Sequence, residues 1–143
     1  MAKIYRYIKA SDEYTSYSPQ GEGITELCTL PDGYTYVSVA DDDQLAAEQP
    51  EQIQIEEPIL TDELKEQIKA ASPHCQLIYQ RMQDKIRAKY CSEDEMYFTR
   101  ISVGQLAGMY QMQPGEPELI VEYQTFIEGV RQWGKSERAQ LGL

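Results

Sequence analysis

A length of 143 residues suits one compact domain or two very small ones, and 41% hydrophobic residues is an ordinary globular value. No apolar run approaches the roughly 18 residues needed to span a bilayer, and the start of the chain lacks a signal-peptide pattern, so we expect a cytoplasmic protein that does not enter membranes. The 24 acidic and 13 basic residues give a net charge of −11, which disfavours nucleic acid as a partner.

Three segments near the N-terminus alternate residue by residue and are rich in β-branched and aromatic side chains, which is typical of strands. They cover residues 3–8, 24–30 and 34–39. In the last of them, Tyr34, Tyr36 and Ser38 share one face. Pro31-Asp32-Gly33 stands between the second and third segments, and because Pro presets φ while Gly tolerates positive φ, this tripeptide predicts a β-hairpin.

The character of the sequence changes near residue 60. Residues 1–63 hold 14 acids and 3 bases, whereas residues 64–143 hold 10 of each, so the whole net charge lies in the front part. Before the junction, which we place at residues 50–60, Asp41-Asp42-Asp43 favours the start of a short helix, and within the junction residues 52–55 suit a short strand. We expect an α+β fold, with a β-rich acidic unit over residues 1–58 and a helical unit over residues 59–143.

Apolar residues recur every three to four positions in the back part, which predicts a hairpin or bundle of three to four helices. Thr61 suits the N-cap of the first, and Ser72-Pro73 starts the second. Ser92 and Glu95 have the spacing of a capping box for the third, which has Met96, Ile101, Val103 and Leu106 among its apolar positions. The last begins near Pro117, and its apolar stripe is typical of a helix–helix contact: Leu119, Tyr123, Phe126, Val130 and Trp133.

Residues suited to catalysis or metal binding are few. His74 is the only histidine, and the odd number of widely spaced cysteines fits free thiols in a reducing compartment. His74, Cys75 and Cys91 lack the paired spacing of a zinc site, although Cys75 lies at a predicted helix start, where a thiolate is stabilised. Asp41 does not begin an EF-hand, because Ala46 stands where the template needs glycine. We therefore expect no enzymatic activity, no metal and no cofactor.

Tyrosine is unusually frequent, with 11 copies against 2 Phe and 1 Trp. Its large ring and polar tip suit half-buried positions and protein interfaces. We name four aromatic residues as candidate contacts with a partner: Tyr34, Tyr36, Tyr123 and Trp133. For Tyr123 and Trp133, packing in the core is the stronger alternative, because both belong to the apolar stripe of the last helix.

The region from Lys85 onward carries one recognisable pattern. It consists of Lys85-Ile86-Arg87-Ala88-Lys89-Tyr90, Ser92-Glu93-Asp94-Glu95, residues 123–128 and residues 131–143. This pattern resembles the C-terminal helical part of small proteins encoded beside tail-fibre genes in tailed bacteriophages and prophages. The resemblance implies a non-enzymatic tail component or tail-fibre assembly protein. Its partners would be phage tail or tail-fibre proteins, and its location the bacterial cytoplasm during assembly, or the virion.

Three further expectations accompany that resemblance. Self-association is one, because the helical unit has few residues with which to bury its apolar stripe. An acidic regulatory or adaptor module that binds host proteins is an alternative function. A small thiol enzyme that uses Cys75 and His74 is a second and weaker alternative.

Overall fold

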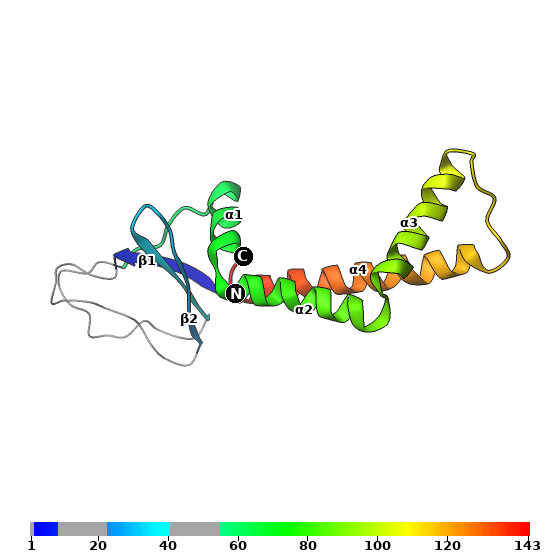
Figure 1. The fold of residues 1–143 in the computed structure, drawn as a ribbon. Helices are drawn as coiled ribbons and strands as arrows, with labels where there is room; N and C mark the ends of the chain where they lie inside the picture. Colours follow the sequence, from blue (N-terminus) through cyan, green and yellow to red (C-terminus); the bar gives the residue numbers. More distant parts are fainter. Residues whose placement is uncertain (1, 9–22, 41–54) are drawn as a thin grey trace. The chain divides into compact units, whose positions relative to one another are not determined.

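The structure is a computed structural model that describes residues 2–8, 23–40 and 55–143. The predicted helix after Asp41 and residues 52–54 of the predicted short strand lie outside these ranges. The α+β prediction is confirmed, since a three-stranded antiparallel sheet is followed by four helices (Figure 1). The elements are β1 (Lys3–Ile8), β2 (Ile24–Thr29), β3 (Tyr34–Val39), α1 (Asp62–Ala71), α2 (Pro73–Lys89), α3 (Ser92–Leu106) and α4 (Glu116–Gln140).

The chain forms two compact units. The first unit comprises residues 1–78 together with residues 136–143, and the second unit comprises residues 79–135. The limits between them fall inside α2 and α4, so each of these helices contributes to both units. Within the described ranges, every helix is too short or too polar to cross a bilayer.

The sheet of the first unit has the order β1-β3-β2, with β3 in the centre. The predicted hairpin is confirmed, because β2 and β3 pair in antiparallel fashion around Pro31-Asp32-Gly33. Gly33 has a φ of +89°, which a residue with a side chain adopts only with strain. Beyond the strands, the backbones of Arg6 and Glu56 exchange two hydrogen bonds of 2.8 and 3.0 Å, so a residue far along the chain continues the sheet edge.

One face of this sheet carries a continuous apolar core. The register pairs Ile4 with Ser38 and Arg6 with Tyr36, so the prediction that Tyr36 and Ser38 share one face of the sheet is correct. A bulge in β2 inserts Leu27 between two paired residues, which turns both Leu27 and Cys28 toward this core. Burying each large aliphatic side chain stabilises the fold by about 1.5–3 kcal/mol.

Helix α1 and the end of the chain cover that core. Ile68 of α1 is fully buried in it, and Leu64, Leu141 and Leu143 pack against it. The sheet core thus includes residues on both sides of the change in sequence pattern near residue 60. The division into folding units at residues 58/59 stays a prediction, whereas the compact unit itself extends to Ile78.

Side chains at the helix ends set where α1, α2 and α3 begin. The Leu64 N–H donates to Thr61 Oγ1 at 3.2 Å, as predicted for an N-cap. Ser72 ends α1 and also accepts from the Cys75 N–H at 3.4 Å, so it caps α2 as predicted. For α3 the predicted cap is wrong by one residue, because Asp94 accepts from the Cys91 N–H at 3.1 Å. Glu95, predicted for that role, binds elsewhere.

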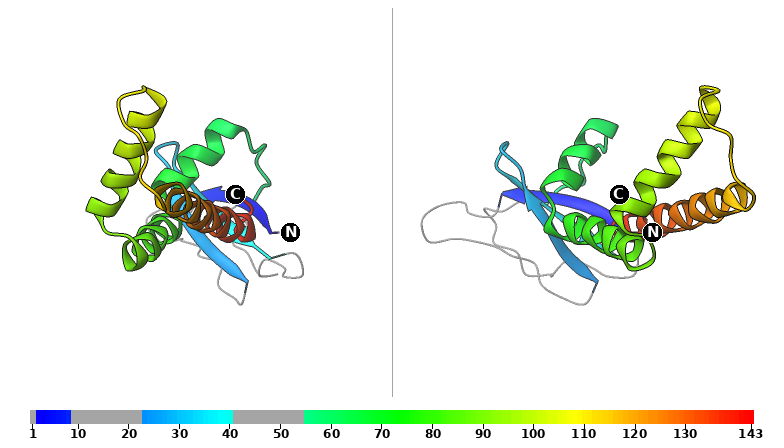
Figure 2. Two further views of the ribbon diagram at one scale, coloured as in Figure 1. Left: turned by 90° about the vertical axis from the view of Figure 1, so that its right-hand side faces the viewer. Right: turned by 45° about the vertical axis from the view of Figure 1, so that its right-hand side comes forward.

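In the second unit, α2 and α4 lie side by side, and the C-terminal end of α3 leans away from α4 (Figures 1 and 2). Gly134 permits the close approach of α2 and α4, since a Cβ there would lie 2.4 Å from Met82 Sδ. Phe98, Ile101 and Val130 are the buried apolar residues of this unit. Leu119, predicted for the apolar stripe of α4, is instead exposed.

Candidate protein-contact site

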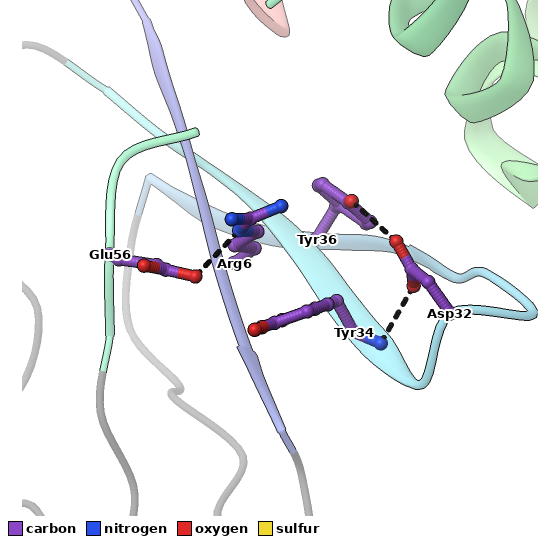
Figure 3. Close-up of polar contacts among 5 residues, drawn as sticks. All are labelled: Arg6, Asp32, Tyr34, Tyr36 and Glu56. Carbon is purple, nitrogen blue, oxygen red and sulfur yellow. Dashed lines mark hydrogen bonds and ion pairs between the residues drawn. The ribbon is translucent and has the colours of Figure 1, made fainter. Parts of the chain in front are cut away.

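Two of the predicted contact residues belong to a polar cluster at the β2–β3 hairpin (Figure 3). Asp32 accepts two hydrogen bonds, from the Tyr34 N–H at 2.8 Å and from the Tyr36 hydroxyl at 3.1 Å. Arg6 donates from Nε to Glu56 Oε1 at 2.7 Å, and its guanidinium carbon lies 4.4 Å from the centre of the Tyr34 ring. The cluster therefore links the turn, β1 and the segment around Glu56 through charged hydrogen bonds and a cation–π contact.

This geometry separates the roles of the two tyrosines. Tyr36 is fully buried in the sheet core, and burial raises the pKa of its phenol. Its ring offers no surface to a partner, so its predicted contact role is corrected to core packing. Tyr34 is half-buried, and Arg6 covers its ring. Only Tyr34 of this pair keeps an accessible edge.

Tyr123 lies in an aromatic cluster of the second unit. The Tyr90 ring packs edge-on against the rings of Phe98, Tyr123 and Phe126, at centroid distances of 5.8, 5.1 and 5.6 Å. The Tyr123 hydroxyl donates to Glu95 at 2.8 Å. Burial, with this hydrogen bond as the second cause, raises the pKa of Tyr123 to about 12. These contacts favour the packing alternative for Tyr123.

Trp133 is half-buried and has its own cation–π contact, with Lys85 Nζ 4.3 Å from the ring centre. Trp133, Phe126 and Val130 line an open groove of about 530 Å³. Tyr123 does not share this groove, since it lines a different one that runs along α3. The second unit therefore places the two predicted aromatic residues at separate surface features.

Three of the exposed apolar side chains of the second unit are ones that the sequence pattern placed among the apolar positions of a helix. On α3, Met96 is 71% exposed, Val103 59% and Leu106 90%. These three residues recur at spacings of seven and three, and so lie on one side of the helix, which we call the α3 outer face. Phe98 and Ile101 occupy the opposite side and are buried.

The α3 outer face borders an open groove. The groove has a volume of about 610 Å³, and Met96, Arg100 and Val103 line it together with Arg87 and Tyr123. The sequence held one signal for this surface: α3 is apolar on two opposite sides, and a helix covers only one side against a single neighbour. Periodicity alone could not tell which side stays open.

The structure places the histidine at the surface and two of the three thiols in the interior. Cys28 and Cys75 are buried and Cys91 is exposed. Burial raises the pKa of both buried thiols, and that of Cys28 reaches about 11. Cys75 is the third residue of α2, where we predicted a stabilised thiolate, but burial raises its pKa by more than Ser72 and the nearby basic residues lower it, which favours the protonated thiol. Among residues 2–8, 23–40 and 55–143, no three His, Cys, Asp or Glu side chains could together hold a metal ion.

Comparisons with protein-family models, with curated proteins and with solved structures find no match for this chain. The tail-protein resemblance therefore rests on the sequence pattern from Lys85 onward. The exposed apolar surface of the second unit is an independent observation.

Proposed function

We propose that this protein is a non-enzymatic, tail-associated or tail-fibre assembly protein of a tailed bacteriophage or prophage, which acts by binding tail or tail-fibre proteins. It would act in the bacterial cytoplasm during assembly, or in the virion. The observation that carries the proposal is the concentration of exposed apolar side chains on the second unit, which also contains most of the residues that carry the resemblance. These side chains are Tyr79, Met96, Val103, Leu106, Met109, Leu119 and Val121.

Exposed apolar clusters on small proteins usually mark contact surfaces, since leaving them in water is unfavourable. Met109 and Val121 are 86% and 65% exposed, at the α3–α4 connection and in α4 respectively. The buried, protonated thiol of Cys75 also supports a role other than thiol catalysis, because the thiolate is the nucleophile.

The test is co-expression of the tagged protein with tail-fibre and baseplate proteins encoded beside its gene, followed by affinity capture. We expect capture of at least one of them, and we expect Met109→Ser combined with Val121→Ser to weaken that capture. Ile59→Ser is the matched control, because Ile59 is equally exposed but belongs to the first unit. Capture of none of these proteins would contradict the proposal.

The salt dependence of capture separates this function from the acidic adaptor alternative. Binding through apolar surface should survive an increase in ionic strength, because screening acts only on charges. Binding through the acidic front part should be lost as the Debye length shortens from about 10 Å at 0.1 M salt to about 3 Å at 1 M salt.

A further inference from the structure

The α3 outer face carries two charged residues as well as its apolar ones. Glu93 and Arg100 are both exposed, and within the described part of the chain neither forms an ion pair or a side-chain hydrogen bond. Arg87, which lines the same groove, differs because it pairs with Glu95. An uncompensated acid and an uncompensated base therefore stand on the same helix.

Their spacing relates them to Met96. Glu93 precedes Met96 by three residues and Arg100 follows it by four. Because successive residues of an α-helix are turned by about 100°, both charges lie on the same flank of Met96, one turn to either side. A twofold axis near Met96 and perpendicular to the helix would bring Glu93 of one copy beside Arg100 of the other, twice.

We infer that the N-terminal part of the α3 outer face, around Met96, is a homodimer interface, in which α3 packs antiparallel against α3 of a second copy about a twofold axis near Met96. The exposure of Met96 on the side of α3 opposite to Phe98 and Ile101 is then explained, since Phe98 and Ile101 pack within the unit and Met96 packs in the dimer. A second copy is favoured over another protein because the charge pattern is complementary to itself, as a twofold interface requires. The open groove beside Met96 and Val103 gives the partner helix room to approach.

A contact confined to one helix face is smaller than the roughly 1,200–2,000 Å² of standard interfaces, so we expect a dissociation constant on the order of micromolar. Sedimentation of the full chain from about 1 to about 300 µM brackets that affinity. We expect a monomer–dimer equilibrium. A protein that stays monomeric throughout this range would overturn the inference.

Charge exchange tests the register. Arg100→Glu places two acids opposite each other at each of two symmetric contacts, so it should raise the dissociation constant about tenfold or more. Glu93→Arg should do the same with two bases, and the double variant E93R/R100E should restore dimerisation. Arg81→Glu, an exposed reversal on α2, is the control and should leave the dimer unchanged. A dimer that persists in Arg100→Glu, or one that the double variant fails to restore, would overturn the proposed interface.

A cross-link tests the position of the axis. In a background with Cys91→Ser, Met96→Cys should form a disulfide-linked dimer on mild oxidation, because residues beside a twofold axis face their own copies. Val121→Cys in the same background is equally solvent-exposed and should remain uncrosslinked. Circular dichroism confirms that each variant keeps its helices. The inference is independent of the proposed function, since a chain can dimerise without binding tail proteins and can bind them as a monomer.

Discussion

Glu116 shows how a single side chain can join separate segments of the second unit. It is the first residue of α4 and is only 5% exposed. Its carboxylate accepts hydrogen bonds from the Tyr110 hydroxyl at 2.7 Å, from the Gln113 N–H at 2.6 Å and from the Tyr97 hydroxyl. It thus ties α3 and the α3–α4 connection to the start of α4, where a negative charge is also favoured.

Glu116→Ala should lower the free energy of unfolding by about 2–4 kcal/mol, because three partly buried donors lose their acceptor. Urea denaturation followed by circular dichroism measures the change. Glu118→Ala is the matched control, since Glu118 is an exposed acid in the same first turn, and its effect should stay within about 0.5 kcal/mol. Equal effects of the two substitutions would show that only helix-end charge matters here.

Tyr123 should make the stability of the second unit depend on alkaline pH. Its folded pKa is about 12, whereas a phenol in an unfolded chain has a pKa of about 10. The folded state therefore holds the proton more tightly, and the stability from this group is fully present below about pH 10 and is lost as pH rises toward 12.

Urea midpoints measured between pH 9 and pH 12 test this expectation, in a range set by the two pKa values. Tyr123→Phe should show a shallower decrease than the unmodified protein over this range, because Phe has no proton to lose. Tyr79→Phe changes an exposed ring and should keep the original decrease. A Tyr123→Phe variant with an unchanged pH dependence would assign the effect to other groups.

At the level of elements, the contact between α2 and α4 depends on glycine at one position and not at another. Gly134 is buried against Met82, whereas a Cβ at Gly129 would meet no atom within 4 Å. Both glycines lie inside α4, so both sites have the same helix preference for Ala over Gly. The two sites therefore differ only in the space that is available for a Cβ atom.

Gly129→Ala should raise the free energy of unfolding by about 0.5–1 kcal/mol, because Ala has the lower conformational entropy in the unfolded chain. Gly134→Ala should lack this gain or destabilise the protein, since Met82 must move. Thermal unfolding measures both. Adding Met82→Ala to Gly134→Ala tests whether steric overlap with Met82 causes the loss of stability. If it does, the double variant should be more stable than the sum of the two single changes predicts.

The elements also show how far local sequence signals reach. The strands, the hairpin turn and the caps at Thr61 and Ser72 were predictable, because each depends on neighbours a few residues away. The cap of α3 was not, since Glu95 bonds to Tyr123, a residue 28 positions along the chain, and Asp94 caps the helix instead. A local sequence pattern cannot show whether Asp94 or Glu95 caps the helix, because the outcome depends on a distant residue.

For the whole molecule, the burial of α1 against the sheet core determines how a helical fragment without the sheet should behave. Residues 61–143 expressed alone should be mostly helical by circular dichroism, as the predicted boundary near residue 60 requires. Within that fragment α1 should exchange its amide hydrogens fast, because Ile68 and Leu64 lose the sheet that buries them.

Hydrogen exchange of the fragment and of the full chain, compared helix by helix, measures this difference. The second-unit part of α4 is the internal control, since its contacts to α2 and α3 remain in the fragment. Full protection of α1 without the sheet would mean that α1 belongs to an autonomous helical unit. A disordered fragment would mean that the two parts of the chain fold only together.

The sequence by itself determined which residues share a face and where most elements begin, because periodicity and caps act over a few residues. The tertiary structure decided what covers each face. It buried Ile68 and Leu141 on the sheet, placed Tyr36 in the core, kept Cys75 protonated, and left the α3 outer face open. Burial is a relation between segments far apart in the chain, so a local pattern can identify an apolar face without identifying its cover.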